Sequence, residues 1–291
     1  MEAIRTTKLT KYYGKSRGIV ELDLTVNEGD FFGFIGPNGA GKSTTIRTLL
    51  GLISPTSGES SIFGKKSSRS GSEILADIGY MPSEAFFYNN MRVRDIIRFS
   101  ADLRGRDCSG EAKALCDRLE LDTAKKVSEL SLGNRKKVSI VCALQHNPKL
   151  CILDEPTSGL DPLMQREFYS ILEERNAQGT TIFLSSHVLS EVQRYCKHAA
   201  VIREGRLLVS DSTRNLGHTE AKRVEIKGVA APPALENIRD VKASDDTVSF
   251  LYSGNPGTLL EALASLPLTD VSIAEPDLEE IFLHYYEKEV D

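Results

Sequence analysis

The sequence lacks a long apolar run. A helix that spans a membrane needs roughly 18 consecutive apolar residues, and no stretch of this 291-residue chain approaches that length. The first eight residues also lack the apolar core of a signal peptide. We therefore expect a protein that is not exported and does not itself form a membrane channel.

Paired cysteine motifs are missing as well. The chain has five cysteines, which are widely spaced, and no two of them form a CxxC motif. An odd number without such pairs is typical of reduced thiols in a cytosolic protein. It argues against a disulfide framework and against a zinc site.

The chain has no excess of positive charge. Its 36 Lys and Arg against 41 Asp and Glu give a formal net charge of −5. Such a mildly acidic protein is poorly suited to broad, nonspecific binding of nucleic acid, so we expect no nucleic-acid partner. Charged residues at 26% and hydrophobic residues at 40% are ordinary for a globular protein, and the length suggests about two domains.

Hydrophobic patterning predicts alternating strands and helices. Residues 18–26 alternate apolar and polar side chains, as a half-buried strand does. The short apolar runs 31–35, 150–153 and 180–184 predict strands that are buried on both faces. Helical spacing is found in residues 42–50, 93–121 and 163–176. This order predicts an α/β fold with a mostly parallel sheet flanked by helices.

The composition changes after Arg206. Residues 211–221 are polar with little strand signal, and we expect a linker there. Beyond it, residues 223–226, 247–251 and 271–273 alternate, while residues 258–266 and those after Pro276 have helical spacing. Asp277 and Glu280 form a start similar to a capping box. These features predict a small α+β domain over residues 222–291, with a ferredoxin-like fold as one option.

A glycine-rich sequence directly follows the apolar run 31–35. Residues 36–43 read Gly-Pro-Asn-Gly-Ala-Gly-Lys-Ser and fit the phosphate-binding pattern GxxxxGK[ST]. Glycines let the backbone curl so that its N–H groups face phosphates, and the helix that follows adds the positive end of its dipole. Lys42 can reach the β- and γ-phosphates, and the Ser43 hydroxyl can ligate Mg²⁺. The residues expected to bind the nucleotide here are Gly36, Pro37, Asn38, Gly39, Ala40, Gly41, Lys42, Ser43 and Thr44.

Two adjacent carboxylates, Asp154 and Glu155, follow the apolar run 150–153. Ligands of open α/β sheets bind at this end of the strands. Asp154 is suited to bind a hard cation directly or through water, and Glu155 could polarise an attacking water. Taken alone, the pair could equally be solvated at a strand-to-loop junction, but the phosphate-binding loop favours a catalytic reading.

With these two sites in place, the chain resembles the ATP-binding subunit of an ABC transporter over roughly residues 3–210. Residues 130–134, Leu-Ser-Leu-Gly-Asn, are similar to the signature motif LSGGQ, and residues 158–161 match the D-loop, which ends at Asp161. His187 matches the switch histidine and Tyr13 the aromatic residue that stacks on adenine. The shared order of these motifs makes the resemblance specific, because small kinases and GTPases lack the signature.

The resemblance implies a P-loop NTPase fold of ABC type. Residues 1–210 would form the ATPase domain, with a mixed sheet core, an antiparallel β subdomain and a helical subdomain at about 85–145. ATP and Mg²⁺ are the implied cofactors. His187 would sense the γ-phosphate, and Ser131 with the Gly133 N–H would cap the nucleotide held by a second protomer. A second copy of the chain, in a head-to-tail dimer with ATP between the protomers, is the simplest arrangement.

The sequence departs from the family pattern at two motifs. In the signature, Leu132 replaces a glycine and Asn134 a glutamine. In the Q-loop, residues 79–84, the expected glutamine is Ser83, which Glu84 follows. Either of these two residues could serve Mg²⁺ directly or through water. The basic run 135–137 after the signature is expected to be mainly a solvated helix face.

These features predict an ATPase that drives a separate membrane permease. The protein would be cytoplasmic and attached peripherally to the inner face of the membrane through that permease, which would dock on residues 86–106. The variant signature and the C-terminal appendage resemble those of bacterial exporters of drugs, peptides or lipids. One alternative is a soluble ABC ATPase that acts on DNA or the ribosome; another is a nucleotide-dependent regulator with little turnover.

Overall fold

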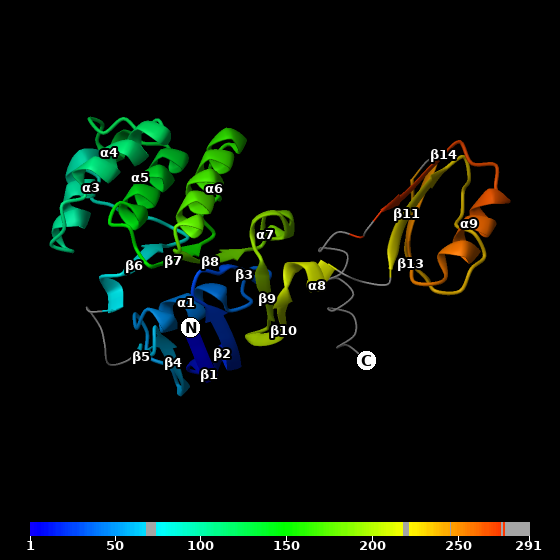
Figure 1. Cartoon of the computed structure of the whole chain (residues 1–291), viewed down its shortest axis with the longest axis horizontal. Helices are drawn as coiled ribbons and strands as arrows, with labels where there is room; N and C mark the ends of the chain where they lie inside the picture. The colour runs from blue at the N-terminus through cyan, green and yellow to red at the C-terminus, as the bar shows by residue number, and fades with distance from the viewer. Residues whose placement is uncertain (68–73, 218–220, 245, 275, 277–291) are drawn as a thin grey trace. The chain divides into compact units, whose positions relative to one another are not determined.

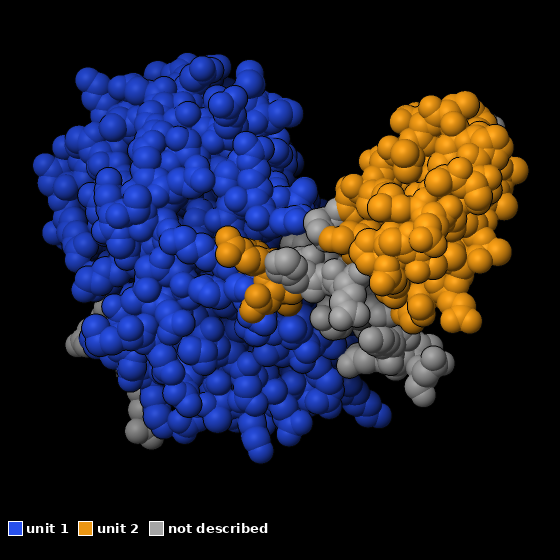
Figure 2. Space-filling model, turned by 45° about the vertical axis from the view of Figure 1, so that its right-hand side comes forward, with its two compact units in different colours: residues 1–212 blue, residues 213–291 orange. Residues whose placement is uncertain are grey.

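The computed structural model describes residues 1–67, 74–217, 221–244, 246–274 and 276. The chain divides into two compact units, Met1–Ser212 and Thr213–Asp291 (Figure 2). Within the described ranges, none of the helices combines the length and the apolar character that crossing a membrane requires.

The centre of the first unit is a six-stranded sheet in the order β10-β9-β3-β8-β7-β6 (Figure 1). Its strands are β3 (Phe31–Ile35), β6 (Ile78–Met81), β7 (Leu150–Asp154), β8 (Thr181–Ser186), β9 (His198–Arg203) and β10 (Arg206–Ser212). Neighbouring strands run parallel except β10, which pairs antiparallel with β9. Every residue of β3, β7 and β8 is buried, which confirms the mostly parallel sheet that the apolar runs predict.

Helices α1 (Lys42–Leu49), α6 (Pro162–Ala177) and α7 (Leu189–Tyr195) flank this sheet. Helix α1 ends beside Gly51, whose φ of 69° lies in the left-handed region that glycine adopts at low cost. The connections place the carboxyl ends of β3, β7 and β8 at one edge of the sheet, because adjacent parallel strands end on the same side.

A second sheet of the first unit is antiparallel and has the order β2-β1-β4-β5. Its strands are β1 (Glu2–Tyr13), β2 (Ser16–Asn27), β4 (Ser57–Ile62) and β5 (Lys65–Lys66). The alternation of β2 buries Leu22, Leu24 and Val26, which share one apolar core with Phe34 of β3 and Ile46 of α1. The two sheets therefore fold around one core on either side of α1.

A helical subdomain lies on the opposite side of the central sheet from β1, β2 and β4 (Figure 1). It contains α3 (Val93–Asp102), α4 (Ser109–Arg118), the short 3₁₀ helix η1 (Val127–Glu129) and α5 (Leu132–Leu144). The helical spacing of residues 93–121 corresponds to two helices, α3 and α4, because the chain turns between them. Gly105 lies in that turn with a φ of 62°.

The second unit begins with α8 (Thr213–Gly217) and forms a four-stranded antiparallel sheet in the order β12-β13-β11-β14. The strands are β11 (Lys222–Lys227), β12 (Ile238–Ser244), β13 (Thr247–Tyr252) and β14 (Asp270–Ala274). Helix α9 (Pro256–Ala264) packs Leu259 and Leu263 against Val224 and Phe250. The unit therefore has an apolar core of its own.

The structure departs from the expected linker and from the ferredoxin-like option in this region. Residues 211–217, expected to belong to a linker, form the end of β10 and helix α8. A ferredoxin-like fold requires two crossover helices; α9 provides one, but residues 228–237 between β11 and β12 contain no helix. The helix expected after Pro276, with Asp277 and Glu280 at its start, lies outside the described residues.

Candidate nucleotide-binding site

The glycine-rich loop joins β3 to α1 and borders a cavity of about 270 Å³. Gly39 and Gly41 have φ values of 80° and 110°, and a Cβ on Gly41 would lie 2.8 Å from the carbonyl oxygen of Gly18. These positions therefore require glycine, and the loop can turn its N–H groups toward the N-terminus of α1. The cavity is lined by Arg17, Gly18, Pro37, Asn38, Gly39, Gly41, Lys42, Ser43, Thr44, Ser83 and Glu155.

Two residues of the predicted loop set do not line this cavity. Ala40 is buried in the apolar core of the unit. Gly36 lies against Ile202 of β9 and accepts a hydrogen bond from Lys42 through its carbonyl oxygen. Ala40 and Gly36 thus pack against the protein interior, whereas the other seven residues of the set line the cavity.

Lys42 is buried and surrounded by oxygen atoms. Its Nζ donates to the carbonyl oxygens of Gly36 and Pro37 and lies 3.1 Å from Oε1 of Glu155. A buried ammonium group must be paired in this way to offset its loss of hydration. Because phosphate oxygens could take the place of the carboxylate, the Lys42 ammonium can bind a nucleotide phosphate with little change in its surroundings.

Asp154 ends β7 and is 1% exposed. Its Oδ1 accepts a hydrogen bond from Oγ of Ser185 at 2.6 Å, while its buried Oδ2 has no hydrogen-bond partner among the described residues. An unsatisfied buried carboxylate oxygen costs free energy, and a hard cation would satisfy it. The part of the chain that the structure describes holds no group of three His, Cys, Asp or Glu that could bind a metal. Mg²⁺ at Asp154 would therefore need further oxygen ligands, such as phosphates and hydroxyls.

Glu155 has a φ of 49°, which places a non-glycine residue in the left-handed region. Such a backbone costs about 1–3 kcal/mol and persists where surrounding contacts hold it. Its N–H donates to the carbonyl oxygen and to Oγ of Ser185, each at 3.2 Å. Its carboxylate contacts Lys42 through Oε1 and Nδ1 of His187 through Oε2, the latter at 2.7 Å.

Strand order brings His187 to Glu155. β7 and β8 are adjacent and parallel, and Asp154 is the register partner of Ser185. The residues that follow the two strands therefore lie side by side, although 32 positions separate them in the sequence. The His187 side chain remains 52% exposed, so it can contact a ligand from the open side of the site.

The Q-loop and the N-terminal aromatic residue lie at the margins of the cavity. Ser83 lines it, whereas Glu84 is exposed and is not among the lining residues. Tyr13 is 46% exposed and lies beside Gly18, where an added Cβ would come within 3.2 Å of the ring. A planar base bound outside the phosphate loop could thus stack on Tyr13.

The signature and the D-loop contact each other and not the cavity. Ser131 is the N-cap of α5 and accepts a hydrogen bond from the N–H of Asn134 at 3.3 Å, while Asp161 caps α6 by accepting from Leu163 and Met164. A Cβ on Gly133 would lie 2.7 Å from the carbonyl oxygen of Gly159. Ser131, Gly133 and Asp161 are not among the residues that line the cavity, so within one chain they do not meet its phosphate loop.

Some residues of this site escaped the sequence analysis. Lys136 and Lys137 are 3% and 9% exposed, so the expected solvated helix face over residues 135–137 is wrong. Nζ of Lys136 donates to the carbonyl oxygen of Glu155 at 3.0 Å. Ser185 and Gly18 were also missed; a glycine inside strand β2 was the available signal for Gly18, because such glycines often mark a close backbone approach.

Comparison with known proteins identifies this arrangement. Residues 19–158 match the family described as "ABC transporter". The chain is 37% identical over 297 residues to the "Bacitracin transport ATP-binding protein BcrA" of Bacillus licheniformis, and the match covers 96% of each protein. The chain belongs to the ABC transporter ATP-binding family. It is an ATPase and an ATP-binding subunit of such a transporter.

Solved structures confirm the predicted ABC-type fold. The structure "Structure of ATP binding subunit of ABC transporter" has a TM-score of 0.68 and 28% identity, and the match covers 74% of this chain and 91% of that one. A second, described as the dimeric structure of a bacterial ABC transporter cassette, has a TM-score of 0.64 and 23% identity over 72% of this chain and 99% of that one. The latter likeness concerns the fold alone.

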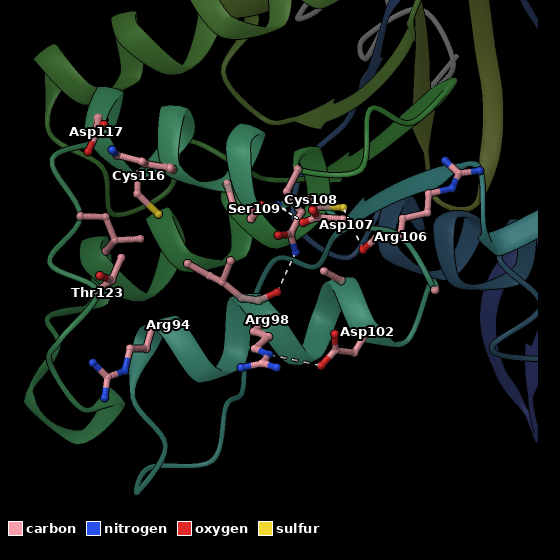
Figure 3. A pocket seen from close by; sticks show the side chains of 17 residues that line it. Arg94, Arg98, Asp102, Arg106, Asp107, Cys108, Ser109, Cys116, Asp117 and Thr123 are labelled. Atoms are coloured by element: carbon pink, nitrogen blue, oxygen red, sulfur yellow. Dashed lines mark hydrogen bonds and ion pairs between the residues drawn. The ribbon is translucent and has the colours of Figure 1, made fainter.

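A larger cavity of about 920 Å³ lies between α3 and α4 of this ABC ATPase (Figure 3), and we name it the helical groove. Its lining is apolar in the middle and charged at the margins. Arg94, Arg98 and Asp102 come from α3, and Arg106, Asp107 and Asp117 from the turn before α4 and from α4 itself. The remaining lining residues are Ile97, Ala101, Gly105, Cys108, Ser109, Ala112, Lys113, Cys116, Leu121, Thr123 and Gln145.

Proposed function

We propose that this chain hydrolyses Mg²⁺-bound ATP as a head-to-tail dimer and thereby drives a separate membrane permease that exports its substrate. The observation that carries the proposal is the contact of Glu155 with both Lys42 of the phosphate loop and His187, next to the buried Asp154 that ends β7. Each of these groups has a distinct chemical part in phosphoryl transfer to water.

The four groups divide the chemistry between them. Lys42 would bind the β- and γ-phosphates, and Glu155 would accept a proton from the attacking water. His187 would contact the γ-phosphate while the hydrogen bond to Glu155 orients its ring. Because Glu155 reaches both Lys42 and His187, its carboxylate lies at the centre of the proposed catalytic group.

The proposed Mg²⁺ ligands are Ser43, Asp154 and Ser83. Mg²⁺ supplies a positive charge that screens the phosphates and orients them for attack. The unsatisfied Oδ2 of Asp154 supports the proposal that Asp154 is a Mg²⁺ ligand. Ser83 is favoured over Glu84 as a ligand because Ser83 lines the cavity. A Mg²⁺ titration of ATPase activity in Ser83→Ala and Glu84→Ala variants tests this choice; only the former should need more Mg²⁺.

The second protomer would be another copy of this chain. Ser131 and Gly133 do not line the cavity at the chain's own phosphate loop, so we infer that they cap a nucleotide presented by another chain. Leu132 between them is 66% exposed, and an apolar side chain in that position favours burial against a partner. A dimeric cassette of the same fold is known. We infer two ATP molecules between two head-to-tail protomers.

The permease would dock on the helical groove and on the exposed aromatic residues that precede α3 in the chain. Phe86 and Tyr88 are 87% and 78% exposed, and residues of α3 and α4 form the walls of the groove. An amphipathic helix placed in an apolar groove with charged margins is a common mode of recognition. Such docking would hold the protein at the inner, cytoplasmic face of the membrane.

Export of a drug, peptide or lipid is supported by the relative named for bacitracin transport. Co-purification from detergent-solubilised membranes tests the transporter assignment directly. A membrane-protein partner is the expected result, whereas ribosomes or DNA would point to the soluble alternative. A nucleotide-dependent regulator is the second candidate; the arrangement of Glu155 and His187 favours turnover, which a steady-state ATPase assay measures.

A further inference from the structure

Lys136 is a buried lysine on the helix that begins at the signature. It lies five positions after Ser131 in α5, is 3% exposed and donates from Nζ to the carbonyl oxygen of Glu155. Burial lowers its pKa, while the nearby charges of Asp154, Glu155 and Glu84 act in the opposite direction. A lysine on a helix normally keeps its ammonium group in water, so this burial requires a specific partner.

That partner is the backbone of the residue proposed to activate water. Glu155 has a left-handed backbone with a φ of 49°. Ser185 holds its N–H side through two hydrogen bonds, and Lys136 holds its carbonyl side. The two anchors come from different elements, β8 and α5. Together they fix the peptide groups on both sides of the Glu155 Cα atom, and therefore the direction of its side chain.

We propose that Lys136 is a positioning residue that holds Glu155 in its left-handed conformation and so directs its carboxylate toward the phosphate loop. The inference rests on the proposed function, in which Glu155 accepts the proton from water. Without the Lys136 donor, the Glu155 carbonyl group would lose this hydrogen bond and the backbone could relax toward an ordinary conformation. The carboxylate would then leave its place between Lys42 and His187.

The position of Lys136 also links two motifs. Helix α5 begins at Ser131, and Gly133 packs against the D-loop residue Gly159. The same helix thus carries both the signature and the side chain that anchors Glu155. In the proposed dimer, α5 would contact the partner's nucleotide through Ser131 and the Glu155 carbonyl oxygen of its own site through Lys136.

Lys136→Met tests the proposal in the full-length chain. Methionine has nearly the same length and removes the donor. We expect kcat for ATP hydrolysis to fall by about 10- to 100-fold, because small misplacements of a catalytic group have effects of this size. The Kd for ATP, measured with a fluorescent analogue, should change by less than about threefold, because the contact is not made to the nucleotide. Lys125→Met removes an exposed lysine (52% exposed) and should leave both values unchanged.

Lys136→Gln provides the graded comparison. Its amide keeps an N–H donor but ends about one bond short of the lysine ammonium, so its kcat should lie between those of the wild-type protein and Lys136→Met. If Lys136→Met does not fold, Lys136→Gln decides the question by the same criterion. A folded glutamine variant with wild-type kcat would overturn the proposal.

A double mutant separates positioning of Glu155 from a general structural effect. In a Glu155→Gln background, Lys136→Met should cause little further loss, because both changes act through the same carboxylate. The inference would be contradicted if Lys136→Met lowered kcat by the same factor in the Glu155→Gln background as in the wild-type protein. It would also be contradicted if Lys136→Met raised the Kd for ATP by as large a factor as it lowered kcat. If Lys42→Ala and Glu155→Gln themselves retain full turnover, the proposed function fails; if they abolish turnover while Lys136→Met does not, the Lys136 inference alone fails.

Discussion

At the scale of single residues, the site depends on buried charges that are paired. Lys42 and Glu155 are 6% and 16% exposed at their side chains and lie 3.1 Å apart. Removing one partner of such a pair leaves the charge of the other buried without a counter-charge. Variants of the two residues should nevertheless have different effects, because the proposed function assigns phosphate binding to Lys42 and water activation to Glu155.

Lys42→Ala should abolish binding of ATP. The variant loses the ammonium group that is proposed to bind the β- and γ-phosphates, and with it charge-assisted hydrogen bonds worth several kcal/mol in total. Equilibrium binding of a fluorescent ATP analogue measures the effect, with Lys125→Met as the control. Wild-type affinity in Lys42→Ala would contradict the assignment of the phosphate loop.

Glu155→Gln should leave ATP binding intact and stop turnover. Glutamine has nearly the same shape but cannot accept a proton from water. We expect kcat to fall by at least about a hundredfold and an ATP-bound dimer to accumulate, which size-exclusion chromatography with light scattering detects. A normal rate of hydrolysis would show that Glu155 is not the catalytic carboxylate.

His146 makes stability depend on pH. The ring is 4% exposed, and Nε2 donates to the Ile78 carbonyl oxygen at 3.1 Å. Burial, assisted by the nearby Arg104, lowers its pKa from 6.5 to about 4. The unfolded chain therefore binds the proton more readily, and the free energy of unfolding should decrease as the pH falls from 6.5 to 4, by on the order of 2 kcal/mol.

Urea unfolding of wild-type protein and His146→Gln at pH 7 and pH 4.5 measures this contribution. The variant lacks the titrating ring, so it should lose less stability on acidification than the wild-type protein does. Equal losses in the two proteins would assign the pH dependence to other groups.

At the scale of elements, the short buried strands could be identified from sequence because an apolar run of four or five residues carries enough signal. Residues 31–35 and 150–153 correspond to β3 and β7. The helical subdomain was harder, because the spacing of residues 93–121 is helical on both sides of the turn at Gly105. β12 was missed; it is mostly exposed, so burial left no apolar alternation in its sequence.

The helical groove has a prediction of its own. Arg94 and Arg98 lie on one turn of α3 and form one charged margin of the groove (Figure 3). Replacing both by Glu should prevent co-purification of the permease, because the charge of that margin is reversed. ATPase activity of the isolated chain should stay within about twofold, because neither residue lines the nucleotide cavity.

Arg166→Glu is the matched control, since Arg166 is an exposed arginine of α6 that does not line the groove. It should retain the permease. Retention of the permease by the Arg94→Glu, Arg98→Glu double variant would place the docking surface elsewhere.

At the scale of the whole molecule, the two units have separate apolar cores. The first is built around β3, α1 and the antiparallel sheet, and the second around β11, β13 and α9. We propose that the first unit is the ATPase domain and the second an accessory domain. Each core contains its own large buried side chains, such as Phe34 in the first and Phe250 in the second.

A chain that ends at Leu216 should therefore stay folded and bind ATP with a Kd within about threefold of the full-length value. Leu216 is 4% exposed, so the cut retains its side chain. Soluble yield, thermal unfolding and ATP binding measure the outcome. Loss of soluble protein would contradict the proposed independence of the two units.

The nucleotide loop could be predicted from sequence because its chemistry is local. A run of eight residues carries the glycines, the lysine and the serine, and the backbone angles that it needs are a property of those residues themselves. The absence of a long apolar run is likewise a property of the linear chain. Neither conclusion requires knowledge of which strands are neighbours.

Contacts between distant parts of the chain required the folded structure. The sheet order β3-β8-β7-β6 is not the order of the sequence, and it places His187 against Glu155 and Ser83 beside the phosphate loop. The burial of Lys136 has the same origin: a basic run after the signature has no local pattern to distinguish a solvated lysine from one that reaches the Glu155 carbonyl. Side-chain environment is set by long-range packing, which leaves little trace in the sequence around each residue.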